Sequence, residues 1–288
     1  MGRDTHDLVM TQTLLSLGHG YSAQALARLL PGWRIIATTR SQEKAERLAG
    51  QGAEARIWPG SDLRDALARA SHVLSSVAPD DEGDPVIREI GPVLAESTHL
   101  RWVGYLSTTG VYGDHGGAWV DEETPLEPTT RRGQARMRAE AEWRALGLPL
   151  HIFRLAGIYG PGRGPFEKVK AGTARRVIKP GQVFSRIHVE DIAQALAASI
   201  ARPRPGAIYN VCDDDPAPPQ DVIEYAAQML GRPVPPAVPF DTAHMTAMAR
   251  SFFAESKRVR NDRMKKDLGV SLKYPTYREG LAASQDED

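Results

Sequence analysis

The chain contains 288 residues, with 36 lysines and arginines, 36 aspartates and glutamates, and a single cysteine. The balanced charge provides no global field that would favour nucleic acid or a membrane surface as a partner. No stretch approaches the roughly 18 consecutive apolar residues that a membrane-spanning helix needs. One cysteine rules out a disulfide within the chain and fits a reducing compartment, and the first residues lack the apolar core of a signal peptide. We therefore expect a cytoplasmic globular protein, present as a monomer or a homodimer.

The first half of the chain alternates predicted strands with predicted helices. Residues 1–11 are polar and patternless, which indicates a flexible lead-in. Six strands are then predicted over 13–17, 33–37, 53–58, 71–77, 100–106 and 148–155, and the helices between them include 42–48, 62–70, 84–94 and 131–146. This alternation is typical of an α/β fold with a doubly wound parallel sheet of the Rossmann type, which binds its ligand at the carboxyl ends of the strands.

Beyond residue 160 the alternation breaks. The predicted elements are a short basic helix over 166–174, a strand over 183–187, a helix over 190–200, a strand over 207–211 that is long enough to join the main sheet, and a helix that opens at 216–219 and runs to 230. The proline-rich stretch 233–239 predicts a rigid extended connector, and the tail from residue 282 is expected to fray. The rest is expected to form a small irregular lobe at the strand ends.

A glycine pattern, G-x-G-x-x-A, joins the first strand to the first helix. Gly18 can adopt the backbone angles of a tight turn, and Gly20 leaves room for a pyrophosphate to approach. The N–H groups at the start of the helix, around Tyr21 and Ser22, form an anion site. These four residues are therefore predicted to hold the pyrophosphate of a dinucleotide. A glycine-rich turn without a ligand is the alternative.

The end of the second strand favours NADP over NAD. NAD sites carry an acidic residue there for the ribose hydroxyls, whereas this chain has Thr39 and Arg40. Arg40 can pair with the 2′-phosphate of NADP, and Thr39 can add a hydroxyl. If Arg40 is merely solvated, the preference stays open. At the end of the fourth strand, Ser76 is small enough to let the nicotinamide ribose pass.

Several blocks, in this order along the chain, resemble the extended short-chain dehydrogenase/reductase family, the relatives of sugar-nucleotide epimerases and dehydratases. The blocks are GHG at 18–20, LSTTGVYG at 106–113, RLAGIYGPG at 154–162, RIHVEDI at 186–192 and IYNV at 208–211. The resemblance extends from about residue 14 to about residue 281. It implies a Rossmann dinucleotide-binding domain over 12–160 with 186–213, and a small substrate-binding lobe over 161–185 with 214–288.

The resemblance implies a catalytic pattern that this chain only partly retains. The family uses a serine or threonine on the fifth strand, which Thr108 matches, and a Tyr-x-x-x-Lys on the next helix. Aligning Gly133 with the glycine of that motif places Arg132 at the tyrosine and Arg136 at the lysine. A guanidinium stays protonated, so Arg132 cannot exchange a proton as a phenol does, although it can stabilise negative charge. Arg136 could donate to the nicotinamide ribose; the alternative is that both arginines are solvated.

Other residues are candidates to replace the missing tyrosine. Tyr112 and Tyr159 lie near the predicted nicotinamide edge and could serve as acids if their pKa values were lowered, although structural roles are favoured. His188 opens a helix in the family motif that it matches, so we expect it to cap or pack. Cys212 follows an apolar strand, which predicts a buried, inert thiol.

A basic cluster lies between the sixth strand and the following helix, and it consists of Lys168, Lys170, Arg175, Arg176, Lys179 and Arg186. Such a cluster favours an acidic ligand. The alternative is that these side chains are simply solvated at the surface. No group of residues has metal-ligand spacing. The sequence therefore predicts an oxidoreductase or epimerase-like protein of the atypical branch of this family, with NADP as cofactor and a small polar substrate, an anionic compound such as a nucleotide sugar being one candidate. The alternative is a non-catalytic regulator that senses NADP(H).

Overall fold

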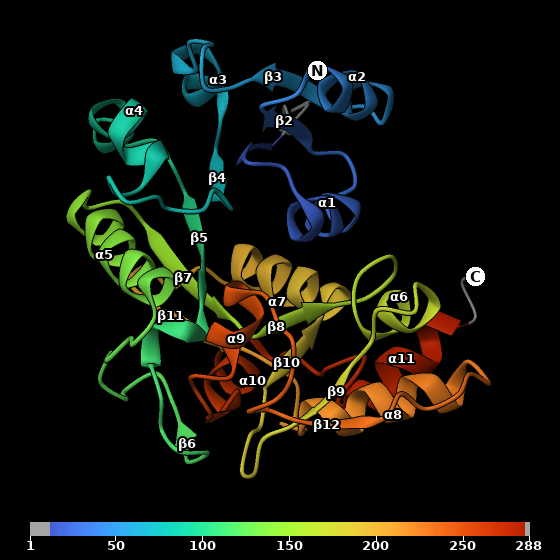
Figure 1. Cartoon of the computed structure of the whole chain (residues 1–288). Helices are drawn as coiled ribbons and strands as arrows, with labels where there is room; N and C mark the ends of the chain where they lie inside the picture. Colours follow the sequence, from blue (N-terminus) through green and yellow to red (C-terminus); the bar gives the residue numbers. More distant parts are fainter. Residues whose placement is uncertain (1–11, 286–288) are drawn as a thin grey trace, which may run out of the picture.

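A computed structural model describes residues 12–285, and a seven-stranded parallel sheet forms its centre (Figure 1). Every neighbouring pair of strands in this sheet is parallel. The strand order, β11-β7-β5-β4-β1-β2-β3, reverses beside β1, as in a doubly wound dinucleotide-binding fold. The strands are β1 (Thr13–Leu17), β2 (Arg34–Thr39), β3 (Glu54–Ile57), β4 (His72–Ser75), β5 (Trp102–Thr108), β7 (Leu150–Leu155) and β11 (Ile208–Val211).

Helices bury both faces of this sheet. Consecutive strand residues alternate between two cores: Leu14 belongs to one and Leu15 to the other. The Leu14 core contains side chains of α1 (Tyr21–Arg28), α7 (Val189–Ala201) and α10 (Asp262–Leu268). The Leu15 core contains side chains of α3 (Arg64–Arg69), α4 (Pro85–Ala95) and α5 (Arg131–Ala145), while α2 (Gln42–Gly50) lies beside β2 and β3. Nearly continuous apolar strands are typical of a parallel sheet that is covered on both sides.

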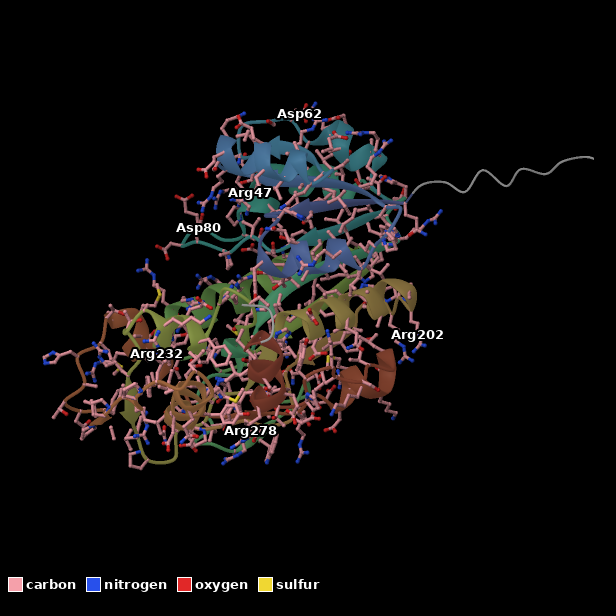
Figure 2. The ribbon with its side chains drawn as sticks, turned by 90° about the vertical axis from the view of Figure 1, so that its right-hand side faces the viewer. Arg47, Asp62, Asp80, Arg202, Arg232 and Arg278 are labelled. Carbon is pink, nitrogen blue, oxygen red and sulfur yellow. The ribbon has the colours of Figure 1, made fainter. Side chains whose placement is uncertain are left out.

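The remaining elements gather at the carboxyl ends of the strands, below α1 in Figure 1. Figure 2 shows the two ends of the molecule, with Asp62 at the end formed by the first half of the chain and Arg278 at the other. Three short parallel pairs, β8 with β10, β9 with β12 and β6 with β13, connect these elements. The elements are η1 (Thr109–Tyr112), β6 (Trp119–Val120), β8 (Gly157–Tyr159), α6 (Pro165–Lys170), β9 (Arg176–Ile178), β10 (Arg186–His188), α8 (Pro219–Met229), β12 (Ala237–Pro239), α9 (Ala247–Phe252), β13 (Arg258–Val259) and α11 (Tyr277–Gln285).

The predicted α/β fold is confirmed, including the strand near residue 207 that joins the main sheet beside β7. Two predicted helix starts are also confirmed. The Ser41 hydroxyl caps α2 by accepting the N–H of Lys44 at 3.1 Å, and Asp84 caps α4 just before Pro85. The flexible lead-in expected over 1–11 lies outside the described residues.

The extended connector predicted over 233–239 ends in a strand, β12, where Val238 packs against Val177 in a small core. Three other predictions for the C-terminal half were wrong. The tail does not fray at 282; α11 continues to residue 285 because Leu281 is buried among Tyr159 and Phe166. The predicted helix 166–174 ends at residue 170, and the strand predicted over 183–187 instead forms over 186–188 beside β8.

The predicted division into two domains remains a prediction. Part of the stretch assigned to the small lobe packs on the dinucleotide-binding domain. Met264, Leu268 and Val270 fall within the stretch assigned to the small lobe, and they are buried in the core around the main sheet. Within residues 12–285, no helix has both the length and the apolar character needed to cross a membrane.

Candidate cofactor and substrate site

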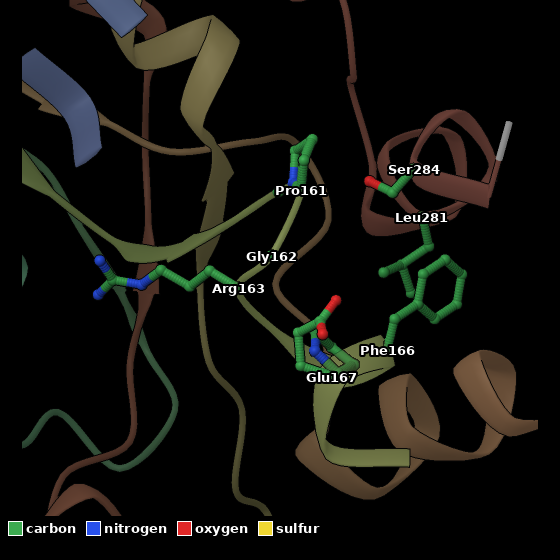
Figure 3. Close-up of a pocket in the computed structure, with 9 residues that line it drawn as sticks. Pro161, Gly162, Arg163, Phe166, Glu167, Leu281 and Ser284 are labelled. Atoms are coloured by element: carbon green, nitrogen blue, oxygen red, sulfur yellow. The ribbon is translucent and has the colours of Figure 1, made fainter. Parts of the chain in front are cut away.

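A cavity of about 1180 Å³ opens at the carboxyl ends of β1, β4, β5 and β7. Small-molecule sites usually measure about 300–1,000 Å³, so this cavity has room for more than one ligand. Eight of the predicted site residues line it: Gly18, Gly20, Tyr21, Ser22, Ser76, Thr108, Arg132 and Arg136. A second cavity of about 90 Å³ lies between α6 and α11 and is too small for a dinucleotide (Figure 3).

The glycine turn has the conformation that the pattern predicts. Gly18 has φ +73°, and a Cβ there would lie 3.0 Å from Cγ2 of Val77, so a larger residue would be both strained and crowded. Gly20 is the N-cap of α1 and supplies no side-chain cap. The first turn of α1 also carries no acidic residue. The positive end of this helix is therefore open toward the cavity and suited to an anion.

Neighbouring side chains hold the glycine turn in place. The Gly18 N–H donates to Oγ1 of Thr38 on β2 at 2.8 Å. The Ser76 hydroxyl lies within hydrogen-bond distance of the carbonyl oxygens of Leu17 and Gly18, so Ser76 braces the turn as well as lining the cavity. His19 is buried with Nδ1 2.8 Å from Oγ of Ser16, and burial lowers its pKa to about 4, which keeps the ring neutral at pH 7.

Thr39 and Arg40 lie at the end of β2, one strand beyond the glycine turn. Neither lines the 1180 Å³ cavity. Arg40 is exposed. Thr39 is buried, and its hydroxyl accepts the N–H of Ser41 at 3.4 Å. The strand order places both residues at the edge of the sheet where an adenosine ribose lies in doubly wound folds.

The predicted catalytic residues come from β5 and α5. The Thr108 hydroxyl faces the turn of η1 and accepts the Gly110 N–H at 3.1 Å. Arg136 donates from Nη1 to the Leu106 carbonyl at 2.6 Å and to the Tyr105 hydroxyl at 3.1 Å, which fixes its guanidinium beside β5. Arg132 is exposed, with Cζ 5.3 Å from the centre of the Phe252 ring.

A buried ion pair fixes α5 against the sheet beneath these residues. Glu140 on α5 is fully buried, and Arg154 on β7 donates to both of its carboxylate oxygens, at 3.0 and 2.8 Å. Ser107, next to Thr108, donates to Glu140 at 2.7 Å. This network sets the position of α5, and hence of Arg132 and Arg136, relative to β5.

The structure contradicts the catalytic role predicted for Tyr112. Its side chain is fully buried and does not line the cavity. The hydroxyl donates to Oδ1 of Asn210 at 2.7 Å and accepts from Arg154 at 2.9 Å, and burial raises the pKa of Tyr112 to about 12. A phenol held in this way cannot reach a substrate or give up its proton near neutral pH.

Three further residues occupy the structural roles that were favoured for them. Tyr159 lines the cavity, but burial raises its pKa, and its hydroxyl donates to the Thr276 carbonyl at 3.4 Å. His188 caps α7 by accepting the Glu190 N–H at Nδ1, 3.2 Å away. Cys212 is fully buried, and burial raises the pKa of its thiol.

The lining of the cavity is cationic although the whole chain is neutral. It contains eight lysines and arginines but three carboxylates, and each carboxylate is already paired: Asp80 with Arg88, Asp81 with Arg131, and Glu255 with Lys257. In the described chain, six of the lining cations form no ion pair within 4 Å: Arg132, Arg136, Arg163, Lys168, Arg175 and Arg186. Such a lining favours an anionic ligand.

Half of the predicted basic cluster reaches this cavity. Lys168, Arg175 and Arg186 line it, whereas Arg176 pairs with Glu224 at 2.5 Å and Lys179 donates to the Phe253 carbonyl. The structure adds lining residues that sequence reasoning missed: Arg163, His244, Phe252 and Lys257. Arg163 directly follows the RLAGIYGPG block at 154–162, but the others follow no motif. Across residues 12–285, no group of three histidine, cysteine, aspartate or glutamate side chains is placed to hold a metal ion.

Comparison with known proteins identifies relatives over most of the chain. No model of a protein family matches it. A conserved protein of unknown function from Silicibacter pomeroyi is 62% identical, with a TM-score of 0.93 over 96% of this chain and 99% of that one. Protein YeeZ of Escherichia coli K12 is 30% identical over 233 residues, 75% of this chain and 82% of YeeZ.

A more distant likeness shows the fold. The UDP-glucuronic acid 4-epimerase of Bacillus cereus, solved in complex with NAD, is 16% identical with a TM-score of 0.75 over 96% of this chain and 98% of that one. Together with the glycine turn, the strand order and the ordered motifs, these likenesses assign the chain. It belongs to the extended short-chain dehydrogenase/reductase family, the family of the NAD-dependent epimerases and dehydratases.

Proposed function

We propose that this protein is an oxidoreductase or epimerase-like enzyme that binds NADP in the 1180 Å³ cavity and acts on a small polar, anionic substrate. The observation that carries the proposal is the convergence of the open N-terminus of α1, Thr108 and six cations without carboxylate partners on one cavity. The structural relative from Bacillus cereus binds NAD, which supports a nicotinamide cofactor.

The residues of the glycine turn fit such a cofactor. The positive φ of Gly18 and the absence of a side-chain cap at Gly20 leave the start of α1 accessible to a pyrophosphate. Arg40, exposed at the end of β2, would pair with the 2′-phosphate, with Thr39 as its buried neighbour. Ser76 would flank the nicotinamide ribose, and Arg136 would donate to that ribose with its remaining N–H groups. A bound nicotinamide dinucleotide supplies or accepts a hydride.

Thr108 and Arg132 would act on the substrate. The Thr108 hydroxyl would donate to the reacting oxygen while its oxygen keeps the Gly110 N–H. Arg132 would stabilise negative charge on that oxygen or hold a substrate anion, because its guanidinium stays protonated. The basic side chains of Lys168 and Arg175 would hold an acidic group such as the phosphate of a nucleotide sugar.

A non-catalytic regulator that senses NADP(H) is the second candidate. The observation in its favour is that Tyr112 and Tyr159 are held in structural hydrogen bonds, while the resemblance aligns Arg132 with the family's catalytic tyrosine. Such a regulator would bind the cofactor tightly and change its affinity for a protein partner without transferring hydride.

Thr108→Val tests the catalytic assignment. We expect purified wild-type protein to oxidise NADPH in the presence of a substrate from a panel of anionic carbonyl compounds and nucleotide sugars. Loss of the Thr108 hydroxyl should lower kcat about 100-fold, because positioned proton donors contribute roughly 10²–10⁴-fold to rate. Thr108→Ser, which keeps the hydroxyl, is the matched control. Equal turnover by the valine variant would refute the role of Thr108, and cofactor binding without turnover on any compound would favour the regulator.

A further inference from the structure

We infer that Arg163 clamps the cofactor pyrophosphate from the side opposite α1, so that the loop 160–164 forms part of the dinucleotide site. The inference rests on the proposed function, because it concerns the same cavity and the same cofactor. Arg163 belongs to the segment predicted as the substrate lobe, far in sequence from the glycine turn. Yet Arg163, Gly18, Gly20 and Tyr21 line one cavity.

The loop approaches the start of α1 closely. The Tyr21 hydroxyl donates to the Pro161 carbonyl at 2.8 Å. At Gly160, which has φ +149°, a Cβ would lie 2.7 Å from the Tyr21 hydroxyl and 2.9 Å from Cγ1 of Val189. The approach therefore requires glycine at this position. Reciprocal backbone hydrogen bonds between Gly160 and Arg163, at 2.9 and 3.0 Å, close the loop into a tight turn that projects the Arg163 side chain.

The side chain of Arg163 points toward α1 and away from the small cavity. Its Cζ lies 5.7 Å from the centre of the Tyr21 ring, over the first residue of the helix. In Figure 3 it extends from the loop in the direction opposite to Phe166, Leu281 and Ser284. Arg163 lines both cavities, but its charged end belongs to the larger one.

The charges at this point favour an anion. The N-terminus of a helix carries about half a positive charge, so a cation beside it is unfavourable unless an anion lies between them. The first turn of α1 contains no acidic residue, and among the described residues Arg163 has no carboxylate within ion-pair distance. A pyrophosphate placed between the helix end and the guanidinium would neutralise both. The same contact would link cofactor binding to the loop that leads into α6 and its Lys168.

Calorimetric titration of the full chain tests this clamp. Arg163→Met keeps the length of the side chain and removes its charge, and Arg163→Lys keeps the charge without the planar fork. We expect the methionine variant to bind NADPH, NADH and ADP-ribose about tenfold more weakly, since all three carry the pyrophosphate. Adenosine 2′-monophosphate, which lacks it, should bind as it does to the wild type. The affinities of the lysine variant for these three ligands should lie between those of the wild type and those of Arg163→Met.

The control is Arg278→Met. Arg278 also stacks on a tyrosine, with Cζ 4.6 Å from the centre of the Tyr277 ring, but it does not line the cavity, so its loss should leave every affinity unchanged. Equal ADP-ribose affinities for wild type and Arg163→Met would overturn the clamp while leaving the proposed function intact. A wild type that binds no dinucleotide would overturn the proposed function and the clamp with it.

Discussion

At the scale of single residues, burial decides which polar groups can take part in chemistry. Tyr112 and Thr108 are close in sequence, but Thr108 reaches the cavity, whereas Tyr112 points into the core and is tied to Asn210 and Arg154. Asp213 is another buried group. It follows β11, its Oδ1 accepts the Asp215 N–H at 3.2 Å, and its other oxygen has no hydrogen-bond partner among the described residues.

Asp213 should make the stability of the protein depend on pH. Burial raises the pKa of its carboxyl to about 8, although Arg186 opposes that rise. The unfolded chain ionises near pH 4, while the folded chain retains the proton up to about pH 8. This contribution to stability is therefore full below pH 4 and is lost as the pH rises toward 8. In Asp213→Asn, the free energy of unfolding in urea should fall less between pH 5 and pH 8 than in the wild type, by at least about 1 kcal/mol.

If the unfolding free energies of the wild type and Asp213→Asn changed with pH in parallel, that result would contradict the expectation. Asp62, an exposed carboxylate that is placed in Figure 2 at the far end of the molecule, supplies the control. Asp62→Asn should leave the difference in unfolding free energy between pH 5 and pH 8 as it is in the wild type.

Sequence reasoning succeeded for residues whose role depends on backbone position. The capping role of His188 and the tight turn at Gly18 follow from where helices and strands begin and end, and the structure shows both. It left a catalytic role open for Tyr112, which the structure contradicts, because spacing places a residue at a strand end without giving the direction of its side chain. Arg163 directly follows the RLAGIYGPG block at 154–162, but its approach to Tyr21 depends on contacts between residues about 140 positions apart, which sequence patterns do not reveal.

At the scale of elements, α5 is the part that brings the catalytic candidates together. It begins at Arg131, capped by Thr130, whose hydroxyl accepts the Gly133 N–H at 3.1 Å. Gly133 packs against η1, the turn that follows Thr108. A Cβ at Gly133 would lie 2.6 Å from the Gly110 carbonyl oxygen and 2.8 Å from Cβ of Pro128. The family resemblance marked this glycine, and the close packing explains why the position is small.

Gly133→Ala should force α5 away from η1. Relief of a backbone contact at 2.6 Å requires a shift of the helix start, so we expect a loss of about 2 kcal/mol in unfolding free energy and weaker NADPH binding through Arg136. Urea unfolding and calorimetry measure both effects.

Gly50 provides the matched control for that variant. It is the last residue of α2, and nothing lies within 4 Å of a Cβ built there. Gly50→Ala should be neutral or stabilising by up to about 1 kcal/mol, because alanine favours helix. If Gly133→Ala proved as harmless as Gly50→Ala, the tight contact between α5 and η1 would not control the site.

At the scale of the whole molecule, the fold places positively charged side chains together at one edge of a parallel sheet. Equal numbers of acidic and basic residues make the chain neutral, yet its large cavity is lined by more cations than carboxylates, and the cations come from α5, α6, β10 and nearby loops. The sheet could be predicted because apolar runs, glycine turns and caps repeat in order along the first half. The short strands that follow β7 could not be placed, because β8, β9, β10, β12 and β13 contain two or three residues each and depend on distant partners, as β12 depends on β9.

In the proposed function, this neutral chain holds NADP at the glycine turn, with Arg40 on the 2′-phosphate. The most direct measurement is a calorimetric titration of the wild type, Arg40→Ala and the control Arg232→Ala with NADPH and with NADH. We predict that the wild type binds NADPH at least about tenfold more tightly than NADH, and that Arg40→Ala loses this preference by weakening NADPH alone, while Arg232→Ala retains it. Equal binding of the two cofactors by the wild type would contradict the role of Arg40, and binding of neither would contradict the assignment of the cavity to a dinucleotide.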